Sequence, residues 1–103
     1  MKPLLIYITA STKQEAEQIS EILIKKKLAS CVNILPEIQS HYIWNGKLQK
    51  EKEVLMLVKT FDAKYKQVES TIKKIHSYET PCIVAIPIIK GNEAYLRWSK
   101  QCM

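Results

Sequence analysis

The stretch SHYIWNGKLQ, residues 40–49, determines the topology predicted for this chain. Asn45 and Gly46 supply the two positive φ angles that a tight type I′ hairpin turn requires. Successive side chains of a strand point to opposite faces, so alternate residues before this turn share one face. Those residues are Ile38, Ser40, Tyr42 and Trp44. The sequence therefore predicts two antiparallel strands joined at residues 45–46.

Both arms of this hairpin are predicted to be long. The first begins near Ser30 and contains Pro36, which removes a ladder donor and predicts a bulge or kink. The second runs from Lys47 to Thr60, and its segment VLMLV (54–58) is typical of a central strand. Arms of about fifteen residues reach about 50 Å at about 3.3 Å per residue, beyond a single small core. We therefore expect the outer part of the hairpin to contact another subunit.

A strand and a helix are predicted before the hairpin. Residues 4–10 form an apolar run with the length of a buried strand. Thr12 and Glu15 then match a capping box, in which the hydroxyl and the carboxylate accept free amides of the first helical turn. Lysines 25–27 place positive charge at the negative end of the helix dipole, so the helix is expected to end there.

A second helix, a last strand and a short C-terminal helix are predicted after the hairpin. Asp62 is a favourable N-cap for a helical stripe that ends near His76. CIVAIPII (82–89) is typical of a buried strand, in which Pro87 marks an edge or a break. Asn92 is expected to cap the terminal helix. The order predicts an α+β, ferredoxin-like βαββαβ sandwich, with two helices on one face of a four-stranded antiparallel sheet.

Size and composition limit the functional classes. A chain of 103 residues with 47% hydrophobic content is expected to form a single domain over residues 1–103. The net charge of +6 invites a nucleic-acid partner. However, Arg97 is the only arginine, and the strand EVLMLVKT (53–60) has no aromatic residue for base stacking, so no nucleic-acid partner is predicted. The N-terminal apolar run is too short for a secretory signal, and no stretch is long enough to span a membrane. We expect a cytoplasmic protein without a membrane partner.

The titratable residues show no catalytic motif. No base is visible within reach of a hydroxyl or thiol, so no catalytic residue and no enzymatic activity are predicted. Cys82 is interpreted as a buried, inert thiol within an apolar strand. The cysteines are odd in number and lack a CxxC pair, which predicts neither a disulfide framework nor a zinc site. They are Cys31, Cys82 and Cys102.

Histidine chemistry leaves two interpretations open. His76 lies beside Tyr78 and Glu79, and imidazole is a ligand that copper and zinc select. The alternative is a helix-terminal histidine that interacts with the last carbonyls. His41, on the exposed arm, is interpreted as a surface residue.

Several segments together form a recognisable pattern. They are ASCVN (29–33), SHYIWNG (40–46), Glu53, KT (59–60), HSYETP (76–81) and YLRW (95–98). With these segments in the family's order and spacing over nearly the whole chain, the sequence resembles the CutA divalent-cation tolerance family. The resemblance implies a homotrimer in which the hairpin arms pair with neighbouring subunits. It also implies intersubunit clefts where side chains of different chains converge, namely Tyr42, Trp44, Lys59, Tyr78, Glu79 and Trp98.

The resemblance further implies a non-enzymatic role in tolerance of divalent metals such as copper, with a metal or a small anion bound at the clefts and no cofactor required. One bacterial branch of the family is credited with copper ligation by a first-strand cysteine and two adjacent histidines. Ile8, Ile75 and His76 stand at these positions here, so His76 is the one predicted metal residue, and weak binding of copper or another divalent cation is expected. Ser77 replaces the family's usual proline, which is expected to loosen the turn. The alternative function is a PII-like structural or signalling trimer with no physiological metal.

Overall fold

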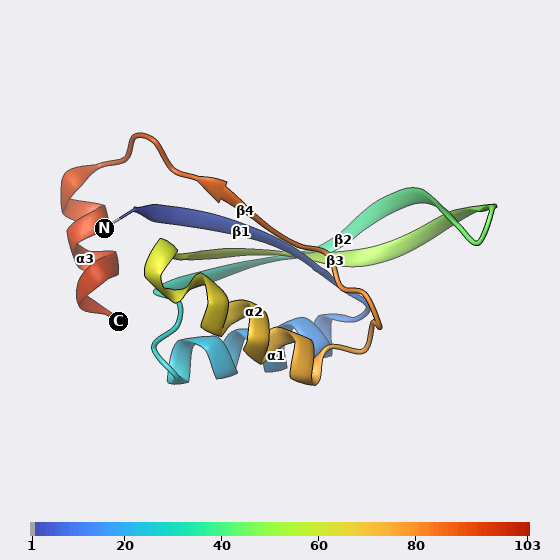
Figure 1. The fold of residues 1–103 in the computed structure, drawn as a ribbon, viewed down its shortest axis with the longest axis horizontal. Helices are drawn as coiled ribbons and strands as arrows, with labels where there is room; N and C mark the ends of the chain where they lie inside the picture. Colours follow the sequence, from blue (N-terminus) through green and yellow to red (C-terminus); the bar gives the residue numbers. More distant parts are fainter. Residues whose placement is uncertain (1) are drawn as a thin grey trace.

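The computed structural model describes residues 2–103 and places four strands and three α-helices in the predicted order (Figure 1). The elements are β1 (Pro3–Ala10), α1 (Lys13–Lys25), β2 (Cys31–Trp44), β3 (Lys47–Phe61), a short 3-10 helix (Asp62–Lys64), α2 (Tyr65–Ile75), β4 (Ile83–Pro87) and α3 (Glu93–Gln101). All strand pairs are antiparallel, in the spatial order β2-β3-β1-β4. The predicted α+β, ferredoxin-like fold is confirmed.

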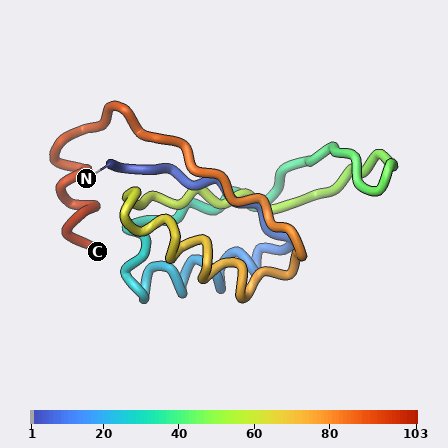
Figure 2. Tube along the Cα trace, in the orientation of Figure 1, coloured from blue at the N-terminus to red at the C-terminus, as the bar shows by residue number. Residues whose placement is uncertain are grey.

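The core lies between one face of the sheet and the helices α1 and α2. Alternate residues of β1 point to this face, and Figures 1 and 2 show both helices beneath it. Strand β3 contributes Val54, Met56 and Val58, and the helices contribute Ala16, Ile19, Leu23, Val68 and Ile72. The β1 residues buried here are Leu4, Ile6, Ile8 and Ala10. Burial of this apolar layer fixes which side of each strand faces the helices.

The opposite face of the sheet is mostly apolar and only partly covered. Pairing places Val84 opposite Tyr7, and Ile86 opposite Leu5, on this face. Val84 is 50% exposed and Ile86 is 47% exposed. We call this surface the open sheet face, formed by Leu5, Tyr7, Leu35, Leu55, Leu57, Val84 and Ile86. A continuous apolar surface of this kind is typical of protein–protein contact.

The hairpin of β2 and β3 extends beyond the rest of the molecule, as predicted (Figure 1). Asn45 has φ 53° and Gly46 has φ 75°, the left-handed values expected for the turn. Strand β1 pairs with β3 only as far as Val54, so residues 38–53 form a two-stranded ribbon that we call the projecting hairpin. The longest dimension of the molecule is 45 Å.

A β-bulge interrupts the pairing of β2 with β3 at the predicted proline. Leu35 pairs with Leu55, but the next paired residue of β2 is Ile38, opposite Glu53. Two residues of β2, Pro36 and Glu37, thus face one residue of β3. The extra residue reverses the alternation of β2, so the even-numbered residues after it share the side that Leu35 faces before it.

Two predicted helix caps are confirmed and one is wrong. The Thr12 hydroxyl accepts the Glu15 N–H at 3.1 Å, and Asn92 Oδ1 accepts the Tyr95 N–H at 2.9 Å. Asp62 does not cap α2, because the chain first makes a 3-10 turn and α2 begins after Lys64 without a side-chain cap. The Asp62 N–H instead donates to the Lys2 carbonyl, at 2.7 Å.

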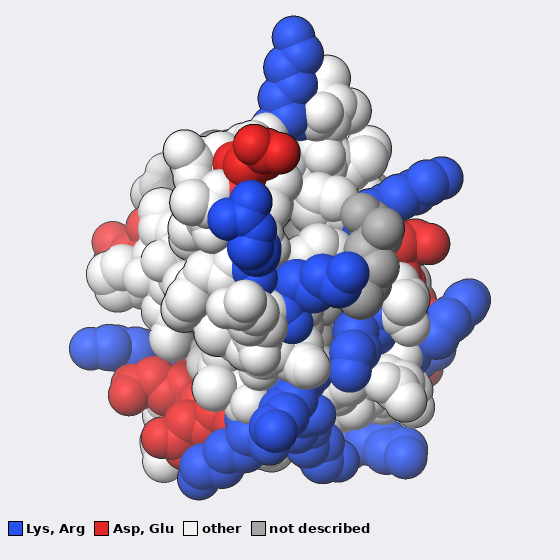
Figure 3. All heavy atoms as spheres, turned by 90° about the vertical axis from the view of Figure 1, so that its left-hand side faces the viewer, with Lys and Arg blue, Asp and Glu red and all other residues white. Residues whose placement is uncertain are grey.

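Positive charge gathers where α1 ends and α2 begins. Figure 3 shows blue side chains concentrated along the helical side of the end that carries α3. The lysines nearest these helix ends are Lys25, Lys26, Lys27, Lys64 and Lys66. The projecting hairpin lies at the other end of the molecule (Figure 1).

Candidate functional site

A cavity of about 520 Å³ lies at the base of the projecting hairpin. The projecting hairpin forms one wall of this cavity. Tyr42 pairs with Gln49, and Glu51 and Glu53 lie on the same face of β3 as Gln49 because side chains two residues apart in a strand share a face. The opposite wall comes from the segment between α2 and β4. The lining residues of this hairpin-base cavity are Thr9, Tyr42, Trp44, Gln49, Glu51, Glu53, Tyr78, Glu79, Thr80 and Cys82.

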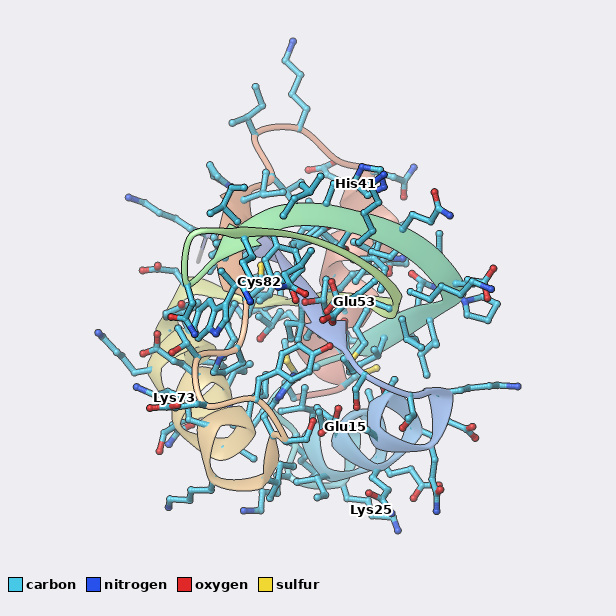
Figure 4. The ribbon with its side chains drawn as sticks, turned by 90° about the vertical axis from the view of Figure 1, so that its right-hand side faces the viewer. Glu15, Lys25, His41, Glu53, Lys73 and Cys82 are labelled. Atoms are coloured by element: carbon cyan, nitrogen blue, oxygen red, sulfur yellow. The ribbon has the colours of Figure 1, made fainter. Side chains whose placement is uncertain are left out.

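A buried carboxylate joins the two walls. Glu53 is only 8% exposed, and the Tyr78 hydroxyl donates to its Oε2 at 2.7 Å. Figure 4 shows Glu53 near Cys82 in the view from the hairpin end. Burial and the Glu53 carboxylate raise the pKa of Tyr78 far above its usual value. Partial removal from water at the cavity wall, together with the same carboxylate, raises the pKa of Cys82. Tyr78 and Cys82 therefore stay protonated, and the negative charge of the cavity resides on Glu51, Glu53 and Glu79.

The turn after α2 is held by His76. Its Nε2 lies 2.8 Å from the Thr9 carbonyl oxygen, and its Nδ1 accepts the Tyr78 N–H at 3.0 Å. This pattern requires the neutral tautomer with the proton on Nε2, which donates to Thr9. The imidazole and the Tyr78 ring are also in contact, with centroids 4.7 Å apart. His76 thus orients Tyr78 toward Glu53.

Glu15 holds the same turn from the start of α1. Its Oε2 accepts the Ser77 N–H at 2.7 Å, and its Oε1 accepts the Ser77 hydroxyl at 3.1 Å and the Ser11 N–H at 3.0 Å. In the predicted capping box, Glu15 would have bonded to the Thr12 amide instead. The expected loosening at Ser77 is not observed, because the N–H that proline lacks is bonded to this carboxylate.

Glu15→Gln is expected to lower the amide-exchange protection of Ser77 about tenfold at neutral pH, because a neutral amide accepts more weakly than a carboxylate. Hydrogen exchange followed by NMR measures this. Glu17→Gln, on the exposed side of α1, is the matched control. Equal Ser77 protection in the wild type and Glu15→Gln would show that Glu15 does not hold the turn.

The same contact predicts a pH dependence. Burial raises the pKa of Glu15, whereas the hydrogen bonds from Ser11 and Ser77 lower it by more. The pKa of Glu15 in the folded protein therefore lies below the ordinary value of 4.5. The carboxylate's contribution to stability is therefore fully present above pH 4.5 and is lost as the pH falls through the lower folded-state pKa. The difference in Ser77 protection between wild type and Glu15→Gln should disappear over that range.

The structure brings together four of the six predicted cleft residues. Tyr42, Trp44, Tyr78 and Glu79 line the hairpin-base cavity. Lys59 and Trp98 lie at the other end of the sheet, beside α3. There the Lys59 Nζ is 5.4 Å from the centre of the Tyr95 ring, which in turn lies 5.6 Å from the Trp98 ring. Within one chain, the six predicted cleft residues thus lie in two separate groups.

The predicted metal positions differ in their surroundings. Ile8 is fully buried in the core, Ile75 is 41% exposed, and both ring nitrogens of His76 are hydrogen-bonded. Across residues 2–103, no group of three or more His, Cys, Asp or Glu side chains is arranged to hold a metal ion. His41 is exposed on the projecting hairpin, as predicted.

Sequence reasoning missed several cavity residues. A two-residue turn at 45–46 places residue 42 opposite 49 and residue 40 opposite 51, so the turn itself contained the signal for Gln49 and Glu51. The interpretation of Cys82 as buried is wrong: β4 begins at Ile83, and Cys82 lies exposed in the preceding segment, at the cavity wall.

Comparisons with known proteins agree with this fold. Residues 4–102 match the family model of the CutA1 divalent ion tolerance protein. The divalent-cation tolerance protein CutA of Archaeoglobus fulgidus is 50% identical over 93 residues, which is 90% of each chain. A solved structure of the periplasmic divalent cation tolerance protein CutA from that organism has a TM-score of 0.95 and 45% identity, covering 97% of each chain.

A plant relative is longer. Protein CutA 1, chloroplastic, of Oryza sativa is 37% identical over 94% of this chain, which spans only 55% of that protein. The names of these relatives thus refer to more than one compartment. In the part of the chain that the structure describes, no helix is long and apolar enough to cross a bilayer.

Proposed function

Because this chain belongs to the CutA1 divalent ion tolerance protein family, we propose that it acts in tolerance of divalent cations as a homotrimer whose hairpin-base cavity binds a cationic ligand. The observation that carries this proposal is the charge of the cavity. Within one chain its lining includes three glutamates and no lysine or arginine, so the carboxylates would still outnumber the ammonium group of one Lys59 from a neighbouring chain. Carboxylates attract cations, so we propose a cation in place of the small anion that the resemblance also allowed.

Trimer formation is supported by surfaces that one chain leaves unpaired. The open sheet face exposes a continuous apolar layer, and the projecting hairpin carries Ile43 at 65% and Leu48 at 60% exposure. Lys59 and Trp98 lie far from the cavity residues of their own chain, so in our proposal a neighbouring chain contributes them to the cleft. A closed ring of three copies would cover these surfaces by symmetry.

A non-enzymatic role is supported by the protonation states at the cavity. Tyr78 and Cys82 are the hydroxyl and thiol that approach Glu53, and the raised pKa of each keeps it neutral. Glu53 accepts the Tyr78 hydroxyl, but an activated nucleophile typically has a lowered pKa, and neither Tyr78 nor Cys82 has one. We therefore propose binding without catalysis.

We also propose a cytoplasmic location, which the three free cysteines support. Reduced thiols are typical of the cytoplasm. Because relatives carry the words periplasmic and chloroplastic in their names, fractionation of cells followed by immunoblotting is the direct test.

Copper binding is proposed to be weak and to involve His76. Ligation by either ring nitrogen would break the hydrogen bond to Thr9 or the hydrogen bond from Tyr78. The free energy of that lost hydrogen bond reduces the net free energy of copper binding. Calorimetric titration with Cu(II) should give a dissociation constant of about 1 mM, a binding free energy near 4 kcal/mol.

His76→Ala is expected to weaken this copper binding, whereas His41→Ala, which removes the exposed histidine of the hairpin, is expected to leave it unchanged. Identical isotherms for wild type and His76→Ala would contradict a metal role for His76. That result would favour the alternative, a PII-like structural or signalling trimer without a physiological metal. The observation behind this alternative is that His76 already uses both ring nitrogens to hold the turn.

A further inference from the structure

We propose that the hairpin-base cavity binds a linear oligoamine, a flexible aliphatic chain with two or three separated ammonium groups. This inference rests on the proposed function, in which the cavity is the ligand site, and it specifies the chemistry of the ligand. Three features carry it: how the carboxylates are distributed, which rings line the walls, and how Glu53 is buried.

The carboxylates of the cavity are spread along its walls. Glu51 and Glu53 are two residues apart on one face of β3, a separation of about 7 Å along a strand, and Glu79 lies on the opposite wall. A bare metal ion needs ligands that converge on one point, and no such group of three exists within residues 2–103. Separated carboxylates instead match a ligand whose positive charges are separated.

Aromatic rings line the space between these carboxylates. Tyr42, Trp44 and Tyr78 contribute to the walls, and Trp44 is 53% exposed. Aromatic faces attract ammonium groups and also pack against methylene chains. An oligoamine alternates these two groups, whereas a hydrated metal ion offers no apolar part to the rings.

Glu53 supplies a buried anchor. It is 8% exposed, and within the described residues the Tyr78 hydroxyl bonds to one oxygen, Oε2. No buried side-chain oxygen or nitrogen of residues 2–103 lacks a hydrogen-bond partner, so Oε1, which Tyr78 leaves free, must open to the cavity. A carboxylate that is mostly removed from water is costly without a cationic partner, and an ammonium group would supply one.

The charge of the whole chain makes this acidic cavity selective. The net charge is +6, and a group of lysines lies at the helix ends on the α3 side (Figure 3). The hairpin also carries lysines, but Lys50 and Lys52 occupy the face of β3 opposite Glu51 and Glu53, and Lys47, beside the turn, does not line the cavity. A cation is therefore repelled by the surface in general and attracted at the cavity. Non-specific attraction of an oligoamine to the surface is disfavoured by the same charges.

Calorimetric titration of the intact protein with spermidine at low ionic strength tests the proposal. We expect saturable binding that Glu53→Gln weakens by about tenfold or more, because one charge-assisted hydrogen bond is lost. Trp44→Ala is expected to weaken binding several-fold. Glu21→Gln, which removes an exposed carboxylate of α1 outside the cavity, is the matched control and should bind as the wild type does. Butylamine, with a single ammonium group, should bind more weakly than spermidine.

Two results would overturn the proposal. Equal spermidine affinity for wild type and Glu53→Gln would show binding elsewhere. If spermidine does not bind, and Glu53→Gln weakens the binding of Cu(II), the oligoamine proposal is wrong. The proposed function, binding of a cation in the cavity, would then still hold. If Glu53→Gln does not fold, Glu51→Gln gives the same test, because Glu51 lines the cavity but is exposed.

Discussion

Val84→Lys is expected to convert the protein from trimers into monomers. Val84 lies on the edge strand β4, half exposed on the open sheet face, so a single chain tolerates a lysine there. In a trimer that covers this face, three lysines would be buried without partners, at a cost of several kcal/mol for each charge. Light scattering after size exclusion should show the mass falling from three times to one times the chain mass of 11.9 kDa.

The matched control is Ile24→Lys. Ile24 is 41% exposed on α1, close to the 50% of Val84, and it lies on the helical side of the sheet. The added charge and the lost apolar surface are therefore similar in the two variants. A mass of three chains for Val84→Lys, or of one chain for the wild type, would contradict assembly through the open sheet face.

Leu23→Ala is expected to lower the free energy of unfolding by about 2 to 5 kcal/mol. Leu23 is fully buried between α1 and the sheet, and its truncation leaves a cavity that the neighbours fill only in part. Denaturant titration followed by circular dichroism measures the change. Wild type and variant must be compared at one protein concentration, because the stability of an oligomer depends on it.

The neighbouring residue provides the control for this prediction. Ile24→Ala removes an exposed side chain of the same size from the same helix, and alanine has the higher helix propensity, so a change within about 0.5 kcal/mol is expected. An equal loss of stability in the two variants would show that the α1–sheet contact is not the core of the fold.

The parts of this fold that were predictable from sequence are those determined by local chemistry. Asn45 and Gly46 specify their turn, Thr12 and Asn92 specify their caps, and the apolar run of residues 4–10 specifies strand β1. Each of these signals lies within a few residues of the structure that it predicts. The predicted Asp62 cap was wrong because the chain makes a 3-10 turn over Asp62–Lys64 before α2 begins.

The candidate site was less predictable because its contacts are distant in sequence. The resemblance indicated Tyr42, Trp44, Tyr78 and Glu79, but the bond from Tyr78 to Glu53 joins residues 25 apart. The bond from Ser77 to Glu15 joins residues 62 apart. No local pattern reveals such a partner. The departure at Ser77 was expected to weaken the turn, whereas it allows a bond that only a residue with an N–H can make.

The bulge at Pro36 and Glu37 sets the direction in which the projecting hairpin leaves the sheet, because a bulge bends and twists the strand that contains it. Loss of one of these two residues would remove this bend, but Tyr42 and Trp44 would stay on the side of Glu51 and Glu53, because the turn at residues 45–46 fixes the pairing of β2 with β3 in the hairpin. The body of the fold would be unchanged, because the bulge lies opposite Val54, the last residue of β3 that pairs with β1. Single-residue insertions and deletions at this point therefore offer evolution a way to re-aim the hairpin at a neighbouring chain while its ligand-facing side chains and the scaffold are kept.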